Sequence, residues 1–180
     1  MKVITFARYF PKKHQREGEA TFFVERIWKG LDTGNRMNGE YSIYYKLPRL
    51  MKDGHWQLPH LWRDQMIDKK FFPKYHTIRA GKRWKVGDWF SPRIWSGLPY
   101  RSKQIQFAPD IQIKNIWDVN IGGERFNKCV SVVHDNSKYE TLIPLADVAK
   151  NDGLSNDDFI NWFPNNFSGQ ILCWSNKIKY

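Results

Sequence analysis

Short β-forming segments divided by turn residues dominate the chain from residue 75 onward, and they limit the folds open to it. The β-branched and aromatic residues predict strands at 75–79, 89–95, 105–107, 111–121, 128–134, 140–143 and 169–174. Two short helices are expected among them, one at 145–150 and one that Ser155 caps. Strands this short, with helices inserted, predict an α+β fold built on a small mixed β-barrel flanked by short helices, and fit neither a sandwich nor a doubly wound sheet.

The amino-terminal part carries fewer strand signals. A strand is expected at 1–10 and a helix from an N-cap at Thr21 to Gly30, with a further short helix at 59–68. Residues 32–58 are rich in turn residues and are interpreted as an insertion. With 180 residues and no linker-like stretch, the chain is predicted to form a single domain over 1–180.

Several classes of protein are disfavoured by what the sequence lacks. No apolar run approaches the length of a membrane span, so we expect a soluble, cytoplasmic protein. The two cysteines are far apart, and the pair His55 and His60 lacks the spacing of a metal site on a helix. We therefore predict no metal and no cofactor. Oligomeric state is not indicated.

Positive charge is concentrated in the first 110 residues. The net charge of +11 comes from 29 basic and 18 acidic residues, and residues 1–110 hold 22 of the basic and 10 of the acidic ones. Residues 74–103 include eight basic residues and a single acidic residue, Asp88, and six aromatic residues are interspersed among the basic ones. Cations bind phosphates with release of counterions, and aromatic faces stack on unpaired bases, so this mixture is typical of an RNA surface. A solvated basic face with buried aromatics, or a surface for acidic proteins, would give the same composition.

One motif in the basic stretch carries chemistry. Lys74, Thr77 and Arg79 form the pattern K-x-x-T-x-R within KYHTIR. Along a strand, Thr77 and Arg79 project from one face and His76 and Ile78 from the other, so an apolar side is expected to anchor the strand and a polar side to line a cleft. A threonine hydroxyl needs a base, and a desolvated lysine beside an arginine can serve as one. A barrel rim with no catalytic role would also place a threonine and an arginine here.

Several segments in order resemble a known family. KYHTIR, AGKRWKVGDWF, WSGLPYRSKQ and DVAKNDGLSNDDFINWF are similar to the ASCH domain family, and the start, FARYFPKKHQREGEATFFVERIW, is similar to its bacterial and prophage members. The resemblance implies a PUA-like β-barrel and an association with RNA. One bacterial member type is an N4-acetylcytidine amidohydrolase that uses a lysine, a threonine and a glutamate.

Carried onto this chain, the resemblance implies that Lys74 and Thr77 hold the lysine and threonine positions. Arg79 is then the signature arginine, and Asp152 holds the glutamate position as a carboxylate one methylene shorter. Our leading prediction is binding of RNA or a modified nucleoside through a basic, aromatic-lined cleft. Hydrolysis of N4-acetylcytidine or a similar acylated nucleobase is the alternative, and a partner-binding role without nucleic acid is the second alternative. The predicted catalytic residues are Lys74, Thr77 and Asp152, and the predicted binding residues are Arg79, Lys82, Arg83, Lys85, Trp84, Arg93, Trp95, Tyr100, Arg101 and Lys103.

Overall fold

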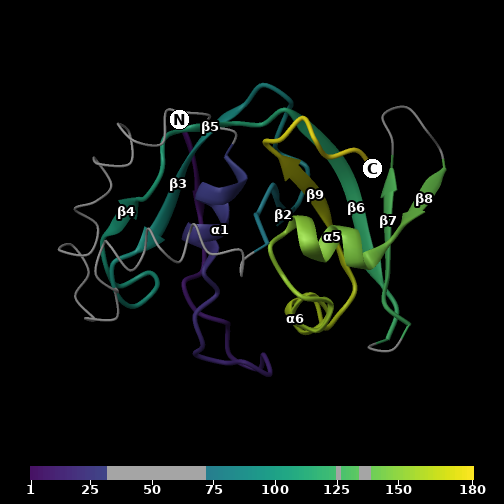
Figure 1. Cartoon of the computed structure of the whole chain (residues 1–180), viewed down its shortest axis with the longest axis horizontal. Helices are drawn as coiled ribbons and strands as arrows, with labels where there is room; N and C mark the ends of the chain where they lie inside the picture. The colour runs from purple at the N-terminus through teal and green to yellow at the C-terminus, as the bar shows by residue number, and fades with distance from the viewer. Residues whose placement is uncertain (32–71, 125–126, 134–138) are drawn as a thin grey trace.

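The computed structural model describes residues 1–31, 72–124, 127–133 and 139–180, and in these ranges the strands form two sheets (Figure 1). In the first sheet, β3 is paired with a parallel β1 and with antiparallel β4 and β5. Its strands are β1 (Lys2–Thr5), β3 (Trp89–Trp95), β4 (Gln104–Gln106) and β5 (Ile111–Gln112).

The second sheet is antiparallel, with the order β2, β9, β6, β7, β8. Its strands are β2 (His76–Ala80), β6 (Asn115–Gly122), β7 (Cys129–Val133), β8 (Glu140–Ile143) and β9 (Phe167–Cys173). The predicted α+β class is confirmed. The predicted closed barrel is not seen among the described strands, which divide between the two sheets.

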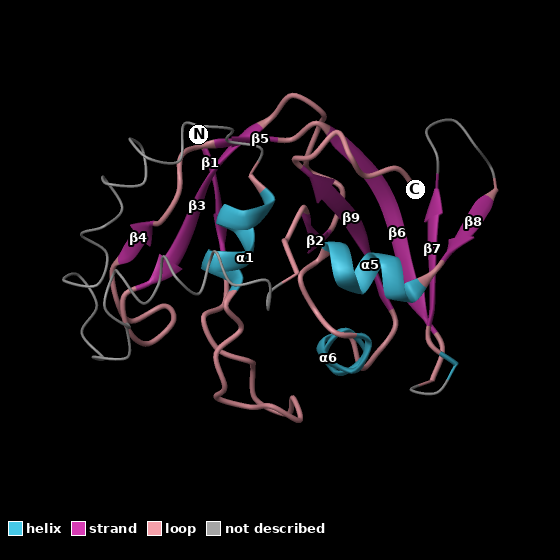
Figure 2. Cartoon of the chain, in the orientation of Figure 1, coloured by secondary structure: helices cyan, strands magenta, loops and turns pink. Residues whose placement is uncertain are grey.

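Three short helices are described, and Figure 2 shows them against the strands. They are α1 (Phe23–Gly30), α5 (Leu145–Asn151) and α6 (Asn156–Trp162). The indole of Trp28 on α1 donates to the carbonyl of Phe107, which follows β4, at 3.0 Å. The end of α5 is tied to the start of the second sheet, because the amide of Tyr75 donates to the carbonyl of Asn151 at 2.8 Å. No helix in the described ranges has the length and apolar character needed to cross a membrane.

Most expected elements are present, with corrections at three places. The predicted N-cap at Ser155 is confirmed, since its hydroxyl accepts from the amide of Asp158 at 3.1 Å. Thr21 lies one residue before the observed N-cap, Phe22. Its hydroxyl accepts from the amide of Phe23 at 3.3 Å and donates to the carbonyl of Ala7 at 2.7 Å, which ties α1 to the first strand region. The expected first strand is shorter than 1–10 and ends at Thr5. The predicted insertion at 32–58 and the helix at 59–68 lie outside the described residues.

The expected strand at 111–121 is two strands in different sheets. β5 pairs with β3 in the first sheet, and β6 pairs with β9 and β7 in the second. The change of partner occurs between them, where the amide of Ile113 donates to Asp88 and the amide of Lys114 donates to Cys173. This segment therefore connects the two sheets, and aromatic side chains pack between them: the ring of Phe90 on β3 lies 6.0 Å from the ring of Trp174, which follows β9.

Candidate functional site

Lys74 and Asp152 form a buried ion pair beside the first residue of β2. Lys74 is 1% exposed, and its Nζ donates to Oδ1 of Asp152 at 2.5 Å and to the carbonyl of the same residue at 2.7 Å. The Nζ also lies 4.4 Å from the ring centroid of Phe23 on α1. The structure thus brings together the lysine and the carboxylate singled out from the sequence.

The backbone around this pair explains why it forms. The amide of Lys74 donates to the carbonyl of Arg26 at 2.8 Å, so the lysine is fixed against α1 before the strand begins. Asp152 is the C-cap of α5, and its amide donates to the carbonyl of Val148 at 2.9 Å. Gly153 then turns the chain with a φ of +74°, a left-handed conformation that glycine adopts without a Cβ clash.

The strand pattern predicted that His76 lies on the apolar, anchoring face of β2. In the structure His76 lies beside the Lys74–Asp152 pair, and the three residues form one cluster. The Nε2 of His76 lies 2.8 Å from the hydroxyl of Tyr180, and its Nδ1 lies 3.4 Å from Oδ1 of Asp152. The Nδ1 contact does not have hydrogen-bond geometry. The hydroxyl of Tyr180 also accepts from Asn151 at 2.9 Å. Spacing offered one signal: residues two apart on an extended segment project to the same side, which places His76 with Lys74.

Burial and charge set the proton affinities in the cluster. Desolvation lowers the pKa of Lys74 to about 8, although the carboxylate of Asp152 acts in the opposite direction. Burial also favours the neutral form of Asp152, but Lys74 and His76 outweigh this effect and hold its pKa below the usual range. Desolvation lowers the pKa of His76. At neutral pH the cluster is therefore a charged lysine and carboxylate with a neutral histidine.

Thr77 and Arg79 lie on the other face of β2. Thr77 is 4% exposed, and no hydrogen bond joins it to Lys74 or Asp152. The guanidinium of Arg79 donates from Nη2 to the carbonyl of Thr5 at 3.2 Å, and its Cζ lies 5.1 Å from the ring centroid of Phe6. The expected apolar anchoring face of β2 thus carries a buried histidine, and the expected polar face is directed toward the first sheet.

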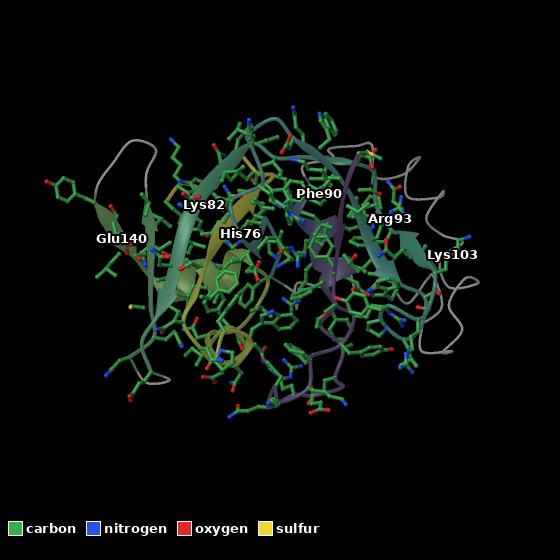
Figure 3. The ribbon with its side chains drawn as sticks, turned by 180° about the vertical axis from the view of Figure 1, so that it is seen from behind. His76, Lys82, Phe90, Arg93, Lys103 and Glu140 are labelled. Carbon is green, nitrogen blue, oxygen red and sulfur yellow. The ribbon has the colours of Figure 1, made fainter. Side chains whose placement is uncertain are left out.

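The predicted basic residues are spread over both sheets. Figure 3 shows Lys82 over the second sheet and Arg93 and Lys103 over the first. Lys82 is neutralised by Asp118, with Nζ 2.6 Å from Oδ2. Among the described residues, no carboxylate lies within ion-pair distance of five others: Arg83, Lys85, Arg93, Arg101 and Lys103.

Two of the predicted aromatic residues lie at the surface, whereas Trp84 does not. Tyr100 is 89% exposed, has a φ of 62° in the turn between β3 and β4, and lies 5.3 Å from the ring of the partly exposed Trp95. Trp84 is only 3% exposed because it packs against Phe90. The ring of Trp84 is therefore not presented at the surface, and its predicted role in binding stays a prediction.

The described residues show no cluster of three or more His, Cys, Asp or Glu side chains that would hold a metal ion. The histidines at 55, 60 and 134 lie outside these residues. Comparison with known proteins found no matching family model, no similar curated protein and no similar solved structure.

Proposed function

We propose that this chain binds RNA, or a nucleoside derived from it, and that its two-sheet fold is PUA-like and of the ASCH type. The observation that carries the proposal is the turn between β3 and β4, which presents Tyr100 to solvent beside Arg101 and Lys103. A tyrosine with a positive φ is uncommon and points to a constraint on its placement. An exposed ring beside cations that no described carboxylate neutralises suits an unpaired base and its phosphates.

RNA affinity is expected to fall steeply with salt. If the five cations that have no carboxylate partner among the described residues all contact phosphates, binding of a single strand should weaken about a hundredfold between about 50 and 200 mM salt, because each contact releases counterions. Fluorescence anisotropy with labelled single-stranded RNA measures this dependence. Binding that hardly changes with salt, or no binding to RNAs of varied sequence, contradicts the proposal.

Matched variants divide the charge and stacking contributions. Arg83→Gln with Lys85→Gln should weaken binding of all sequences alike and lower the salt slope, since phosphate contacts carry no sequence information. Lys12→Gln with Lys13→Gln removes the same charge from the loop at 11–19 and is the control.

Tyr100→Ala should cost about 1–3 kcal/mol of binding free energy through lost stacking. Tyr139→Ala, at a ring 81% exposed near β8, should cost nothing.

Hydrolysis of an acylated nucleobase is the second candidate function, and the buried Lys74–Asp152 pair favours it. A lysine with a pKa of about 8 is poised to exchange a proton near neutral pH, and such perturbed groups are concentrated at functional sites. In this scheme neutral Lys74 takes a proton from water as the water oxygen attacks the acyl carbon. If the Thr77 hydroxyl attacks instead, the acyl group is transferred to Thr77, and a water molecule then hydrolyses the threonine ester and releases the acid. Arg79 stabilises the oxyanion, and the C–N bond breaks as Asp152, protonated through Lys74, returns the proton to the leaving amine.

The assay is release of acetate from N4-acetylcytidine. Lys74→Ala should abolish turnover, whereas Asp152→Glu, which extends the carboxylate by one methylene, should raise it. Thr77→Val tests whether the hydroxyl takes part, because the structure shows no hydrogen bond between Thr77 and Lys74. If neither the unmodified chain nor Asp152→Glu releases acetate, hydrolysis of this substrate class is refuted, and the RNA-binding proposal is unaffected.

A further inference from the structure

The outward face of the first sheet carries two tryptophans and an arginine along one strand. On β3, Trp89, Arg93 and Trp95 alternate with Phe90 and Ile94, which are both 0% exposed, so the first three residues share the face opposite to the core. Trp89 is 52% exposed, and Arg93 and Trp95 are partly exposed. The binding residues predicted from the sequence do not include Trp89. An indole exposed on the outside of a sheet offers a surface on which an unpaired base can stack.

Polar side chains from the neighbouring strands complete this face. Thr5 on β1 and Gln104 on β4 are register partners of β3 residues, and Nε2 of Gln104 donates to Oγ1 of Thr5 at 3.4 Å, so the two side chains meet across β3. The Nε of Arg93 donates to Oγ of Ser91 at 3.2 Å, which directs the guanidinium along the strand toward Trp89. The face therefore holds a cation and hydrogen-bonding groups between its two aromatic ends.

Two turns bring further cations to the ends of β3. At its start, the amide of Asp88 donates to the carbonyl of Lys85 at 3.1 Å and closes the turn that leads into the strand. At its end, the amide of Ser96 donates to the carbonyl of Lys103 at 2.9 Å. Figure 3 shows Arg93 and Lys103 over the same sheet. Among the described residues, no carboxylate lies within ion-pair distance of these three cations. Positive charge thus follows the whole length of β3, as a phosphate backbone requires.

We infer that single-stranded RNA lies along β3 on this face, with one base stacked on Trp89 and another on the paired rings of Trp95 and Tyr100. The inference rests on the proposed RNA-binding function and identifies the path of the strand. Trp95 follows Trp89 by six positions, which is about 20 Å along a β-strand. At a stacked rise of about 3.4 Å, this distance corresponds to about six nucleotides. Duplex RNA does not suit the face, because its bases are already stacked and paired.

The first experiment measures the affinity of a labelled ten-nucleotide single-stranded RNA by fluorescence anisotropy. Trp89→Ala should weaken binding at least about fivefold, because one stacking contact is lost. Trp89→Phe keeps a ring at this position and should restore most of the lost affinity. Phe72→Ala is the matched control, because its ring is 51% exposed but lies ahead of β2 and away from the face, so binding should stay within about twofold of the unmodified chain.

The dependence on RNA length tests the path of the strand. Affinity should rise steeply up to about six nucleotides and only slowly beyond, because a strand of that length reaches both aromatic ends of β3. A duplex with the same sequence should bind at least about tenfold more weakly than the single strand.

Photo-crosslinking of the unmodified chain keeps the test decisive if Trp89→Ala does not fold. Trypsin cleaves after Lys85, Arg93 and Arg101, so the two ends of β3 fall in separate peptides, 86–93 and 94–101. A ten-nucleotide RNA with 4-thiouridine near its 5′ end and one with it near its 3′ end should label different members of this pair of peptides.

Four results overturn the inference. If RNA binds with the expected salt dependence but Trp89→Ala binds as the unmodified chain does, or crosslinks fall outside both peptides, the proposed function stands without this path. Affinity that is complete with one or two nucleotides identifies a site for a single base. A chain that forms a dimer, which Trp89→Ala dissociates with RNA affinity unchanged, assigns the face to a second copy. If no RNA binds, the proposed function fails as well.

Discussion

Replacing Asp152 with alanine is expected to lower the free energy of unfolding by about 3–5 kcal/mol, because it leaves the charge of Lys74 buried without its partner. Urea denaturation at pH 7 measures the loss. Asp147→Ala, at an exposed carboxylate in the first turn of the same helix, is the control and should cost less than about 1 kcal/mol. The double variant Lys74→Met, Asp152→Leu should recover most of the stability, since an apolar pair needs no ionic partner.

The pH dependence of the Asp152→Ala deficit identifies its cause. Without the carboxylate, the folded-state pKa of Lys74 falls below the value of about 8 that it has in the unmodified chain. Between the folded-state pKa and the unfolded value near 10.5, the unfolded chain binds a proton that the folded chain does not, so stability rises with pH by up to about 1.4 kcal/mol per unit. Stability begins to rise at a lower pH in Asp152→Ala than in the unmodified chain. The difference in stability between the two should therefore shrink between pH 6 and pH 9. A constant deficit across this range would show that lost packing, and not the buried charge, is responsible.

Gly30→Ala is expected to destabilise the chain by about 3 kcal/mol or more and to displace the candidate site. A Cβ at this position would overlap the carbonyl oxygen of Lys74, which belongs to the backbone and cannot turn away. The end of α1 and the residue that precedes β2 would have to separate, which moves the Nζ of Lys74 relative to Asp152. Thermal unfolding reports the stability.

Gly97→Ala is the matched control for this prediction. Its Cβ would lie 3.5 Å from the Cβ of Ser102, an ordinary contact distance, so little change in melting temperature is expected. If Gly30→Ala melts as the unmodified chain does, the close approach of α1 to Lys74 is not required for the fold. A variant that remains folded but loses the lowered pKa of Lys74 would show that Gly30 positions the site and contributes less to stability.

The local sequence determined the α+β class and the positions of most elements. Strand signals depend on side chains alternating between buried and exposed positions, and the Ser155 cap depends on an amide three residues away. Both can therefore be predicted without knowledge of distant contacts. Gly30 ends α1 as predicted. The physical reason is a different one: the glycine makes room for the backbone of Lys74, a residue 44 positions further on.

The tertiary structure alone decided what each face of β2 packs against. Alternation placed His76 opposite Thr77 and Arg79, but only the docking of α5 and of Tyr180 gave His76 its polar neighbours. The same holds for Trp84, whose basic surroundings in the sequence indicated a surface position although Phe90 buries it. The segment at 111–121 has a continuous strand pattern, yet it divides because its two halves find partners in different sheets. The sequence pattern predicts which side chains share a face of a strand. What that face contacts depends on packing between segments far apart in the chain, where burial and hydrogen bonding outweigh local preference.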